Sequence, residues 1–192
     1  MSDTVDHRSY ASLEQFRPRL IDTYLDIYKN PVIVTEKIHG SNVQFTASWN
    51  GTTWVWHIGS RKRWVAENEK FNNVHKIHTN LLTNLTDLCD ELRNDKEDIT
   101  IRLYGEVFGG KYGGETAPNA FKTQNEVNYG RDNDVAFFDI VINGDTMPIV
   151  EAFNLLNKHG LRTAPVIYQG SFANFVKSFN VNQFESVVSH RF

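Results

Sequence analysis

The sequence contains a single cysteine, Cys89, among its 192 residues, so no disulfide can form within the chain. Such sparse use of cysteine suits a reducing compartment. Proline and glycine are also scarce, at 5 and 12 residues, which excludes collagen-like and low-complexity chains. There are 20 Lys and Arg residues against 23 Asp and Glu, giving a net charge of -3. This balance argues against a globally basic surface for nucleic acids but leaves room for a local basic patch.

Long hydrophobic runs are missing as well, since none approaches the roughly 20 residues that a membrane-spanning helix needs. The first residues have neither the basic segment nor the apolar core of a signal peptide. A chain of this length buries about 70% of its unfolded surface and needs no disulfide or metal to fold. With 40% hydrophobic and 22% charged residues, we expect a soluble intracellular globular protein with one domain over residues 1–192.

Segments that are rich in β-branched residues or alternate in hydrophobicity predict a set of strands. Two of them, Asn42–Trp49 and Thr52–Ile58, flank Asn50-Gly51, a strong signal for a hairpin turn. Trp54 and Trp56 would share one face of the second strand and pack in the core. Further strands are expected at Val32–Val34, Ile99–Tyr104, Val135–Ile142 and around Ala164–Tyr168, with a second turn at Asn143–Asp145.

Apolar residues at helical spacing predict the helices. The clearest lies between Phe71 and Asn94, where leucines and other apolar residues step by three or four and Cys89 is expected to be buried. Other helices are expected from Ser12 to Lys29, from Ile149 to His159 before Gly160, after the cap Ser171, and over Val181–Val188. Hairpins interrupted by helices, without regular βαβ alternation, predict an α+β fold with a largely antiparallel sheet.

The segment Lys37-Ile38-His39-Gly40-Ser41-Asn42 lies between two expected strands. A lysine there would sit at the rim of a sheet, and the glycine allows close approach of the backbone to a ligand. Lysine is a nucleophile only when it is deprotonated, which requires burial or neighbouring cations. Taken alone, the pattern also fits a solvated turn.

Lys-x-His-Gly-x-Asn resembles the nucleotidyl-acceptor motif of ATP-dependent RNA ligases of the RNA ligase 2 type, which include the kinetoplastid RNA-editing ligases. DNA ligases and capping enzymes usually carry Asp-Gly where this chain has His39-Gly40, so the RNA branch is favoured. The resemblance implies that Lys37 attacks the α-phosphate of ATP and becomes Lys-AMP. It also implies that His39 and Asn42 act near the phosphates and ribose, and that Glu36 contacts adenine.

A basic motif follows in the order that this family has. Ser60–Arg63 comes directly after the expected hairpin, where the family contacts AMP and the 5′-phosphate end of the nucleic acid. Arg61 is the better match by its Ser-Arg setting, and Arg63 is a close second. A planar guanidinium suits this task because it donates two parallel hydrogen bonds to phosphate.

Two further motifs complete the resemblance. Leu103–Val107 is similar to the Gly-Glu motif whose glutamate, here Glu106, binds the ribose hydroxyls; a carboxylate can accept from both. Phe137–Ile140 is similar to the Phe-Asp-Ile motif whose ring, here Phe138, stacks on adenine. One member of a Phe-Phe pair on a strand faces the core in any case, because neighbours point opposite ways.

These motifs together imply an α+β nucleotidyltransferase domain of the ligase and capping-enzyme superfamily, with largely antiparallel sheets flanked by helices. They imply an RNA repair enzyme that uses ATP with Mg²⁺ or Mn²⁺ and joins RNA 3′-hydroxyl and 5′-phosphate ends. We expect a cytoplasmic protein without a membrane partner, and a phage or virus is among the sources that the resemblance allows.

The pattern departs from the family near the C-terminus, where a Glu-Gly-x-Val motif and a paired-lysine motif are expected. Glu185-Ser186-Val187-Val188 lacks the glycine and falls in a helical apolar pattern, so we interpret it as helix. The domain over 1–192 is then C-terminally incomplete. Three alternatives stay open: a fragment of a longer ligase, a split ligase completed by a second polypeptide, or a catalytically incomplete remnant that binds nucleotide or RNA.

Other patterns are weaker. Gly105–Tyr112 nearly spells a phosphate loop but ends in tyrosine where a Ser or Thr must bind magnesium. His75 and His78 are spaced to share a helix face but have no evident third ligand for zinc. The metal ligands therefore stay unassigned.

Overall fold

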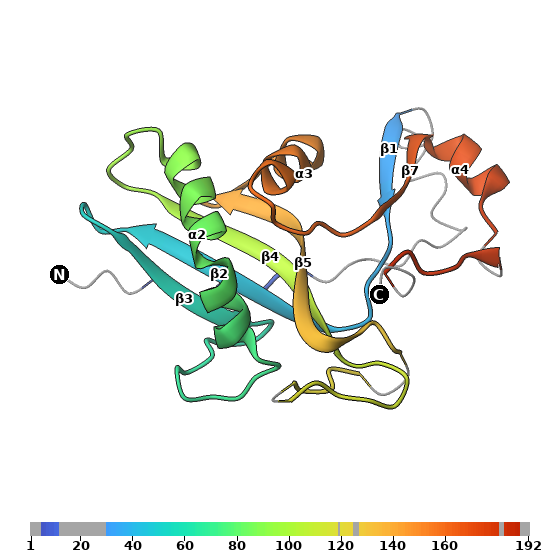
Figure 1. Cartoon of the computed structure of the whole chain (residues 1–192). Coiled ribbons are helices and arrows are strands. Elements are labelled where there is room, and N and C mark those ends of the chain that lie inside the picture. Colours follow the sequence, from blue (N-terminus) through green and yellow to red (C-terminus); the bar gives the residue numbers. More distant parts are fainter. Residues whose placement is uncertain (1–4, 12–29, 119, 125–126, 181–182, 189–192) are drawn as a thin grey trace. The chain divides into compact units, whose positions relative to one another are not determined.

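The computed structural model describes residues 5–11, 30–118, 120–124, 127–180 and 183–188. The chain forms two compact units, most of whose elements are labelled in Figure 1. The main unit contains residues 1–10 and 38–163, and the smaller unit contains residues 11–37 and 164–192. The two units therefore alternate along the chain, and each is built from two separate segments.

A five-stranded antiparallel sheet forms the centre of the main unit. Its strands follow the order β3-β2-β4-β5-β6, and every neighbouring pair is antiparallel. This arrangement confirms the predicted α+β fold. The strands are β2 (Ser41–Trp49), β3 (Trp54–Ser60), β4 (Thr100–Lys111), β5 (Gly130–Ile142) and β6 (Asp145–Thr146).

The two predicted hairpins are present, with different turns. Between β5 and β6, Asn143 and Gly144 have φ values of 50° and 102°, as a two-residue turn requires. Between β2 and β3 the turn is longer than predicted, and the strand begins at Trp54 instead of Thr52. The reason is the Asn50 side chain, whose Oδ1 accepts from the backbone N–H groups of Thr52 (3.0 Å) and Thr53 (2.8 Å).

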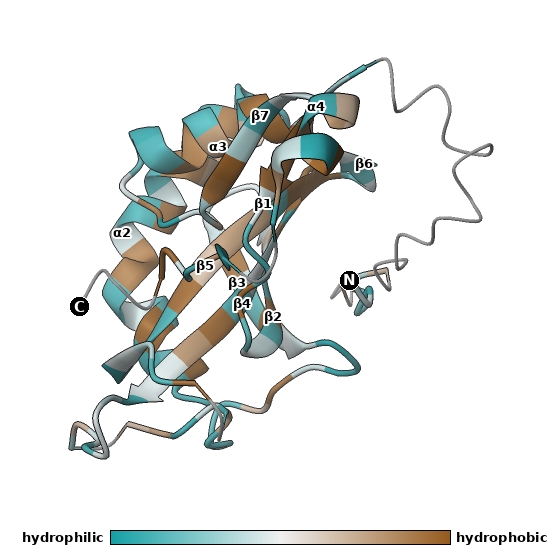
Figure 2. Cartoon of the chain, turned by 90° about the vertical axis from the view of Figure 1, so that its right-hand side faces the viewer, coloured by the Kyte–Doolittle hydropathy of each residue, from teal (hydrophilic) through white to brown (hydrophobic). Residues whose placement is uncertain are grey.

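Two helices of the main unit cover the hydrophobic face of this sheet, α2 (Val74–Arg93) and α3 (Ile149–Lys158). Both carry hydrophobic and hydrophilic residues on different sides, as the colours in Figure 2 show. Phe45, Phe137, Leu85 and Leu156, from two strands and both helices, are fully buried, which places the core between the helices and the sheet. Asn84 joins the two helices by donating from Nδ2 to the His159 carbonyl at 2.7 Å.

The tryptophan face packs in the core, as predicted. Trp54 is buried, and its Nε1 donates to Asp90 of α2 at 2.8 Å. The Trp56 ring lies 4.9 Å from the ring of His78, also on α2. Cys89 is fully buried in the same helix, and burial raises the pKa of its thiol. It is therefore a packing residue, as predicted from its place in the apolar stripe.

The opposite face of the sheet is polar and yet buried. Gln44 and Thr46 of β2 and Arg102 of β4 are at most 5% exposed. Residues 5–10 run across this face and hydrogen-bond to its side chains. Because an unpartnered polar group in the interior is costly, this segment is required for the polar face to be buried.

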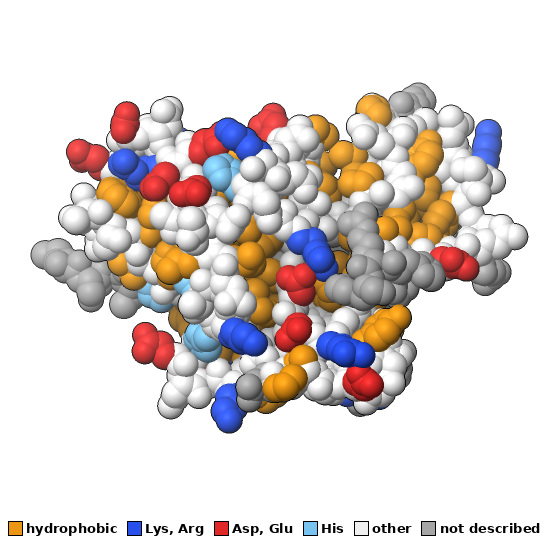
Figure 3. Space-filling model, in the orientation of Figure 1, with side chains coloured by type: hydrophobic (Ala, Val, Ile, Leu, Met, Phe, Trp, Pro, Cys, Tyr) orange, Lys and Arg blue, Asp and Glu red, His pale blue; other side chains and the backbone are white. Residues whose placement is uncertain are grey.

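The smaller unit contains the antiparallel pair of β1 (Pro31–Thr35) and β7 (Val166–Ser171), followed by α4 (Phe172–Ser178). Ser171 caps α4 as predicted, accepting on Oγ from the backbone N–H of Asn174. The Phe175 and Phe179 rings are stacked at 4.7 Å. Hydrophobic side chains reach the surface over β7 and α4, as Figure 3 shows, and the most exposed are Val166, Val176 and Phe179.

The predicted helix over Val181–Val188 is wrong in its described part, because residues 183–188 form no α-helix. The backbone N–H groups of Val187 and Val188 donate to the buried Glu36 carboxylate instead. The predicted helix from Ser12 to Lys29 lies outside the described residues. Among the helices that the structure describes, none combines the length and hydrophobicity needed to cross a bilayer.

The burial of His78 predicts a pH-dependent stability. Its ring lies against Phe45 and Trp56, and burial lowers its pKa to about 4. Below pH 6.5 His78 becomes protonated in the unfolded chain but stays neutral in the folded chain. The free energy of unfolding therefore decreases as the pH drops from about 6.5 to about 4. Allowing for the partial exposure of the ring, this loss is about 1–2 kcal/mol.

Urea unfolding of the wild type and of His78→Phe at several pH values checks this prediction. The phenylalanine variant should lack this part of the pH dependence, so its stability relative to the wild type should rise steadily between pH 6.5 and 4. His75→Gln, on the same helix, should retain most of the wild-type slope. Equal slopes for His78→Phe and the wild type would contradict the prediction.

Candidate functional site

Asn42 and Glu106 lie side by side on neighbouring strands of the main sheet. They are direct partners in the antiparallel register of β2 with β4, so their side chains leave the sheet on the same side. Both are partly buried. Glu106 Oε1 accepts a hydrogen bond from the backbone N–H of Gly40 at 3.1 Å. The sheet thus brings together two residues that the sequence motifs singled out separately.

Three hydrogen bonds hold the backbone of His39 and Gly40. Besides the bond to Glu106, the His39 N–H donates to the Tyr129 hydroxyl at 3.1 Å, and Gln124 Nε2 donates to the Gly40 carbonyl at 2.7 Å. A Cβ at Gly40 would lie only 2.1 Å from the Val107 carbonyl oxygen. The glycine is therefore required for close packing on β4, which is a different reason from the ligand approach that the sequence suggested.

Phe137 and Phe138 point to opposite sides of β5. Phe137 is fully buried and its ring packs 5.9 Å from Phe45 in the core. Phe138 is partly buried, and its ring lies 5.0 Å from that of Tyr10. Tyr10 also contacts Tyr104, which lies two residues before Glu106 on β4. Phe138 is therefore on the same face of the sheet as Glu106.

A bulge accounts for the position of Phe138. Tyr104 pairs with Asp139 while the next residue, Gly105, pairs with Phe137, so Phe138 is an extra residue without a partner on β4. Asp139 accepts a hydrogen bond from the Tyr10 hydroxyl. Burial raises the pKa of the Asp139 carboxyl, and this hydrogen bond opposes the rise. Burial and the neighbouring Asp139 also raise the pKa of Tyr10, so its hydroxyl keeps its proton and donates.

Glu36 and Lys37 belong to the smaller unit and differ sharply in exposure. Glu36 is only 6% exposed, whereas Lys37 is exposed. The Glu36 carboxylate accepts from the Ser186 hydroxyl and from the backbone N–H groups of Val187 (2.9 Å) and Val188 (3.4 Å). Residues 186–188 therefore form a turn around a buried carboxylate, which explains why their apolar spacing does not produce a helix.

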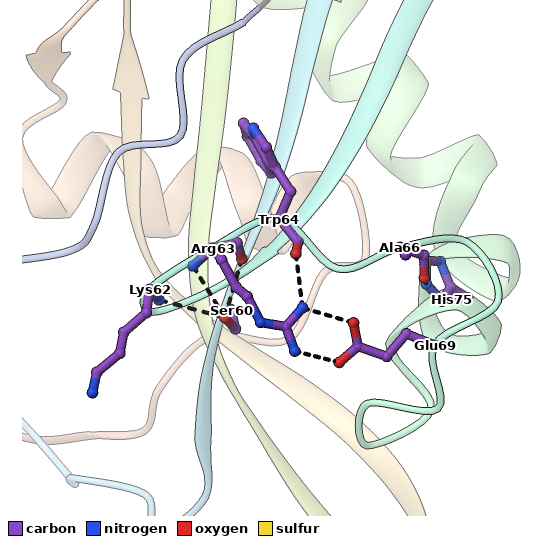
Figure 4. A network of polar contacts seen from close by, with 7 residues as sticks. All are labelled: Ser60, Lys62, Arg63, Trp64, Ala66, Glu69 and His75. Carbon is purple, nitrogen blue, oxygen red and sulfur yellow. Dashed lines mark hydrogen bonds and ion pairs between the residues drawn. The ribbon is translucent and has the colours of Figure 1, made fainter.

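The basic motif forms a turn after β3, drawn in Figure 4. Arg63 makes a two-pronged ion pair with Glu69, with both N···O distances 2.7 Å. This pairing raises the pKa of Arg63 and lowers the pKa of Glu69. The Ser60 hydroxyl donates to the Arg63 carbonyl at 3.1 Å and closes the turn. Arg61 is exposed at the tip of the same turn.

The weaker patterns of the sequence form no site. Gly109 and Gly110 lie within β4, which continues to Lys111 where a phosphate loop would lead into a helix. His75 contacts the Ala66 carbonyl, while His78 packs against aromatic rings. Within the part of the chain that the structure describes, no group of three His, Cys, Asp or Glu residues could hold a metal ion.

The candidate residues that the main sheet brings together combine polar groups with an aromatic ring. An amide (Asn42), a carboxylate (Glu106) and an aromatic ring (Phe138) share one face of three adjacent strands. The carboxylate can accept from vicinal hydroxyl groups, and the ring offers a flat apolar surface for a planar base. Gln124 and Tyr129 support this site without any motif to mark them, because they lie in a connection that has no periodic pattern.

The fold is similar to that of solved RNA ligase structures. A mutant of Naegleria gruberi RNA ligase with ATP and Mn matches with a TM-score of 0.56 and 14% identity, covering 84% of this chain and 44% of that one. The same ligase with PPi matches with a TM-score of 0.56, 15% identity and the same coverage. The architecture is thus the nucleotidyltransferase fold of RNA ligases.

The family itself follows from the sequence. The family model described as RNA ligase matches residues 30–187. This chain therefore belongs to the RNA ligase family. It spans less than half the length of the solved ligases that it matches. Among curated protein sequences, none matches it.

The turn around Glu36 predicts a contrast between two substitutions. Glu36→Ala leaves the Val187 and Val188 N–H groups without their acceptor and should destabilise the protein by about 1–3 kcal/mol. Glu36→Gln should cost less, since its amide oxygen can accept from both N–H groups and its amide nitrogen can donate to the Ser186 hydroxyl.

Hydrogen exchange at the Val187 and Val188 amides, followed by NMR, measures this directly. Protection should be lost in Glu36→Ala and largely kept in Glu36→Gln. Glu185→Gln, which changes the neighbouring exposed carboxylate, should leave the protection unchanged. Full protection of both amides in Glu36→Ala would show that the carboxylate does not hold the turn.

Proposed function

We propose that this chain is the nucleotidyltransferase part of an ATP-dependent RNA ligase, which joins RNA 3′-hydroxyl and 5′-phosphate ends through a Lys37-AMP intermediate in RNA repair. The observation that carries the proposal is the pairing of Asn42 with Glu106 beside the anchored His39-Gly40 segment. A site of this kind needs a nucleophile, acceptors for ribose and a surface for the base, and the motif residues supply each. A cytoplasmic location fits the single buried cysteine, Cys89.

The residues fit ATP as the bound nucleotide. Phe138 is a partly buried ring on the sheet face that carries Glu106, which suits stacking on adenine and acceptance from the ribose hydroxyls. His39 and Asn42 would support the phosphates and ribose. The Glu36 carboxylate already accepts three hydrogen bonds and is held rigidly. Its remaining lone pair would accept from the exocyclic amine of adenine.

Lys37 is exposed in this structure, so the proposed reaction needs neighbouring cations to favour the deprotonated Nζ, which then attacks the α-phosphorus of ATP. A P–N bond forms, the bond to the bridging oxygen breaks, and pyrophosphate leaves. AMP then passes to the 5′-phosphate of RNA, which returns the Lys37 amine. Finally the RNA 3′-hydroxyl attacks that phosphate and AMP leaves. Mg²⁺ or Mn²⁺ would neutralise the phosphate charge that develops in these steps.

Arg61 is the residue we propose for the phosphate contact. Arg63, the alternative from the sequence, is committed to Glu69 by two hydrogen bonds of 2.7 Å. A guanidinium held in this way is a structural part of the turn. Arg61 lies exposed two residues earlier, and its Ser-Arg setting is the better match to the basic motif of the family.

The alternative function is binding without catalysis, either as one half of a split ligase that needs a second polypeptide or as a nucleotide- and RNA-binding fragment. It requires only the residues on the face of the main sheet that would hold ATP, namely Asn42, Glu106 and Phe138. Phosphoryl transfer depends on cations that stabilise the developing charge, so a part that lacks some of them would bind ATP and transfer AMP slowly.

Substitution of Lys37 tests the proposed nucleophile. Incubation with ATP labelled on the α-phosphate and Mg²⁺ or Mn²⁺, followed by a denaturing gel, should give a labelled wild-type band. Lys37→Ala should give none, and neither should Lys37→Arg, because a guanidinium stays protonated. Lys177→Ala, an exposed lysine of α4, should keep the label. A labelled Lys37→Ala band would overturn the assignment, whereas an unlabelled wild type that binds ATP would favour the binding function.

A second pair of variants separates the two arginines. Arg61→Ala should slow AMP transfer by roughly 10- to 100-fold, because a charge-assisted contact to phosphate is lost. Arg63→Ala should act differently, because removing this guanidinium leaves Glu69 without its ion pair and loosens the turn. We expect it to lower the rate of AMP transfer less than Arg61→Ala does. Single-turnover rates of both variants measure this contrast. A larger rate loss in Arg63→Ala than in Arg61→Ala would reverse the assignment.

A further inference from the structure

Residues 5–10 form a strap across the polar face of the main sheet. Two backbone carbonyls of this strap accept from buried side chains: Asp6 O from Arg102 at 3.3 Å, and Arg8 O from Gln44 Nε2 and the Tyr104 hydroxyl, both at 3.0 Å. These side chains are 5%, 1% and 4% exposed. The strap therefore takes the place of water for polar groups of β2 and β4, and this fixes its course over the sheet.

The strap is also anchored near β3. His7 Nε2 lies 2.9 Å from the Ser60 carbonyl oxygen and 2.8 Å from Gln44 Nε2. The His7 ring meets the Trp64 ring edge-to-face at 5.0 Å. The segment is thus held by backbone and side-chain contacts before it reaches Tyr10, so the position of Tyr10 is determined by the sheet.

Tyr10 ends the strap at the β5 bulge. Its hydroxyl donates to Asp139, and its ring lies 5.0 Å from Phe138 at 65° and 5.1 Å from Tyr104 at 52°. Phe138 is the extra residue of the bulge, so the register of β4 does not constrain it. The hydrogen bond to Asp139 holds Tyr10 in place, and its edge-to-face contact then restricts the orientation of the Phe138 ring.

We propose that Tyr10 is a positioning residue for nucleotide binding, which acts through Phe138 and holds that ring in the orientation that stacks on the base. This inference rests on the proposed function of Phe138. The strap thereby makes a segment far from every sequence motif part of the nucleotide site. Tyr10 orients the ring, and the ring contacts the base.

If Tyr10 acts through Phe138, substituting it should weaken binding of the base and leave binding of the phosphates unchanged. Calorimetric titration in a Lys37→Ala background, where no covalent chemistry occurs, compares ATP with inorganic tripolyphosphate, which lacks the base. Tyr10→Ala should weaken ATP binding about three- to tenfold, which is the range expected for losing an aromatic contact. It should leave tripolyphosphate binding unchanged. Tyr10→Phe, which keeps the ring, should retain most of the ATP affinity.

A double-mutant cycle shows whether Tyr10 acts through the ring. Phe138→Ala should weaken ATP binding at least as much as Tyr10→Ala, and the double variant should bind no more weakly than Phe138→Ala alone. Tyr112→Ala, an exposed tyrosine of the same unit, should have no effect. If Tyr10→Ala does not fold, Tyr10→Leu keeps the apolar volume without the ring and replaces it.

The outcomes of these experiments distinguish the positioning role of Tyr10 from the proposed function. Equal ATP affinity in Tyr10→Ala and its parent, or additive losses in the cycle, would overturn the positioning role while the proposed function stands. A parallel loss of ATP and tripolyphosphate binding would make Tyr10 merely structural and would also overturn it. A folded parent that binds neither ATP nor tripolyphosphate would overturn the proposed function, and the positioning role with it.

Discussion

The main unit depends on the antiparallel register of β2 on β4. This register places Asn42 opposite Glu106 and lets the Gly40 N–H reach a carboxylate 66 positions later in the chain. Because side chains alternate along a strand, a slip of one residue would turn Glu106 into the core and Leu103 out of it. The hydrophobic core therefore enforces the geometry of the polar site, although the two lie on opposite faces of the same strands.

A sheet that is buried on both faces has to satisfy two different requirements. On one face α2 and α3 exclude water from aliphatic and aromatic side chains, and no directional bonds are needed there. On the other face Gln44, Arg102 and Tyr104 need hydrogen-bond partners, which the carbonyls of residues 6 and 8 provide. Hydrogen bonds restrict geometry more than apolar contacts do, so the polar face is well suited to hold a precisely arranged site.

Local signals were sufficient for much of this architecture. The apolar stripe of α2, the asparagine-glycine turns and the capping residue Ser171 each act within a few residues, and a sequence displays such patterns directly. The features that escaped prediction depend on partners far along the chain. Val187 and Val188 have helical spacing, but the Glu36 carboxylate, about 150 positions earlier, binds their backbone N–H groups and prevents a helix. The strap could not be predicted either, because its backbone carbonyls find their donors only on the strands of the folded sheet.

Lys37 lies between two anchored stretches of backbone. On one side, Glu36 is held by three hydrogen bonds within the smaller unit. On the other, His39 and Gly40 are held by Tyr129, Gln124 and Glu106 within the main unit. Each set of hydrogen bonds fixes the backbone within its own unit, up to the residue before Lys37 in one and from the second residue after it in the other. Reduced freedom before reaction lowers the entropic part of a barrier, so in the proposed reaction these residues would contribute to the rate by holding the backbone next to Lys37, the proposed nucleophile.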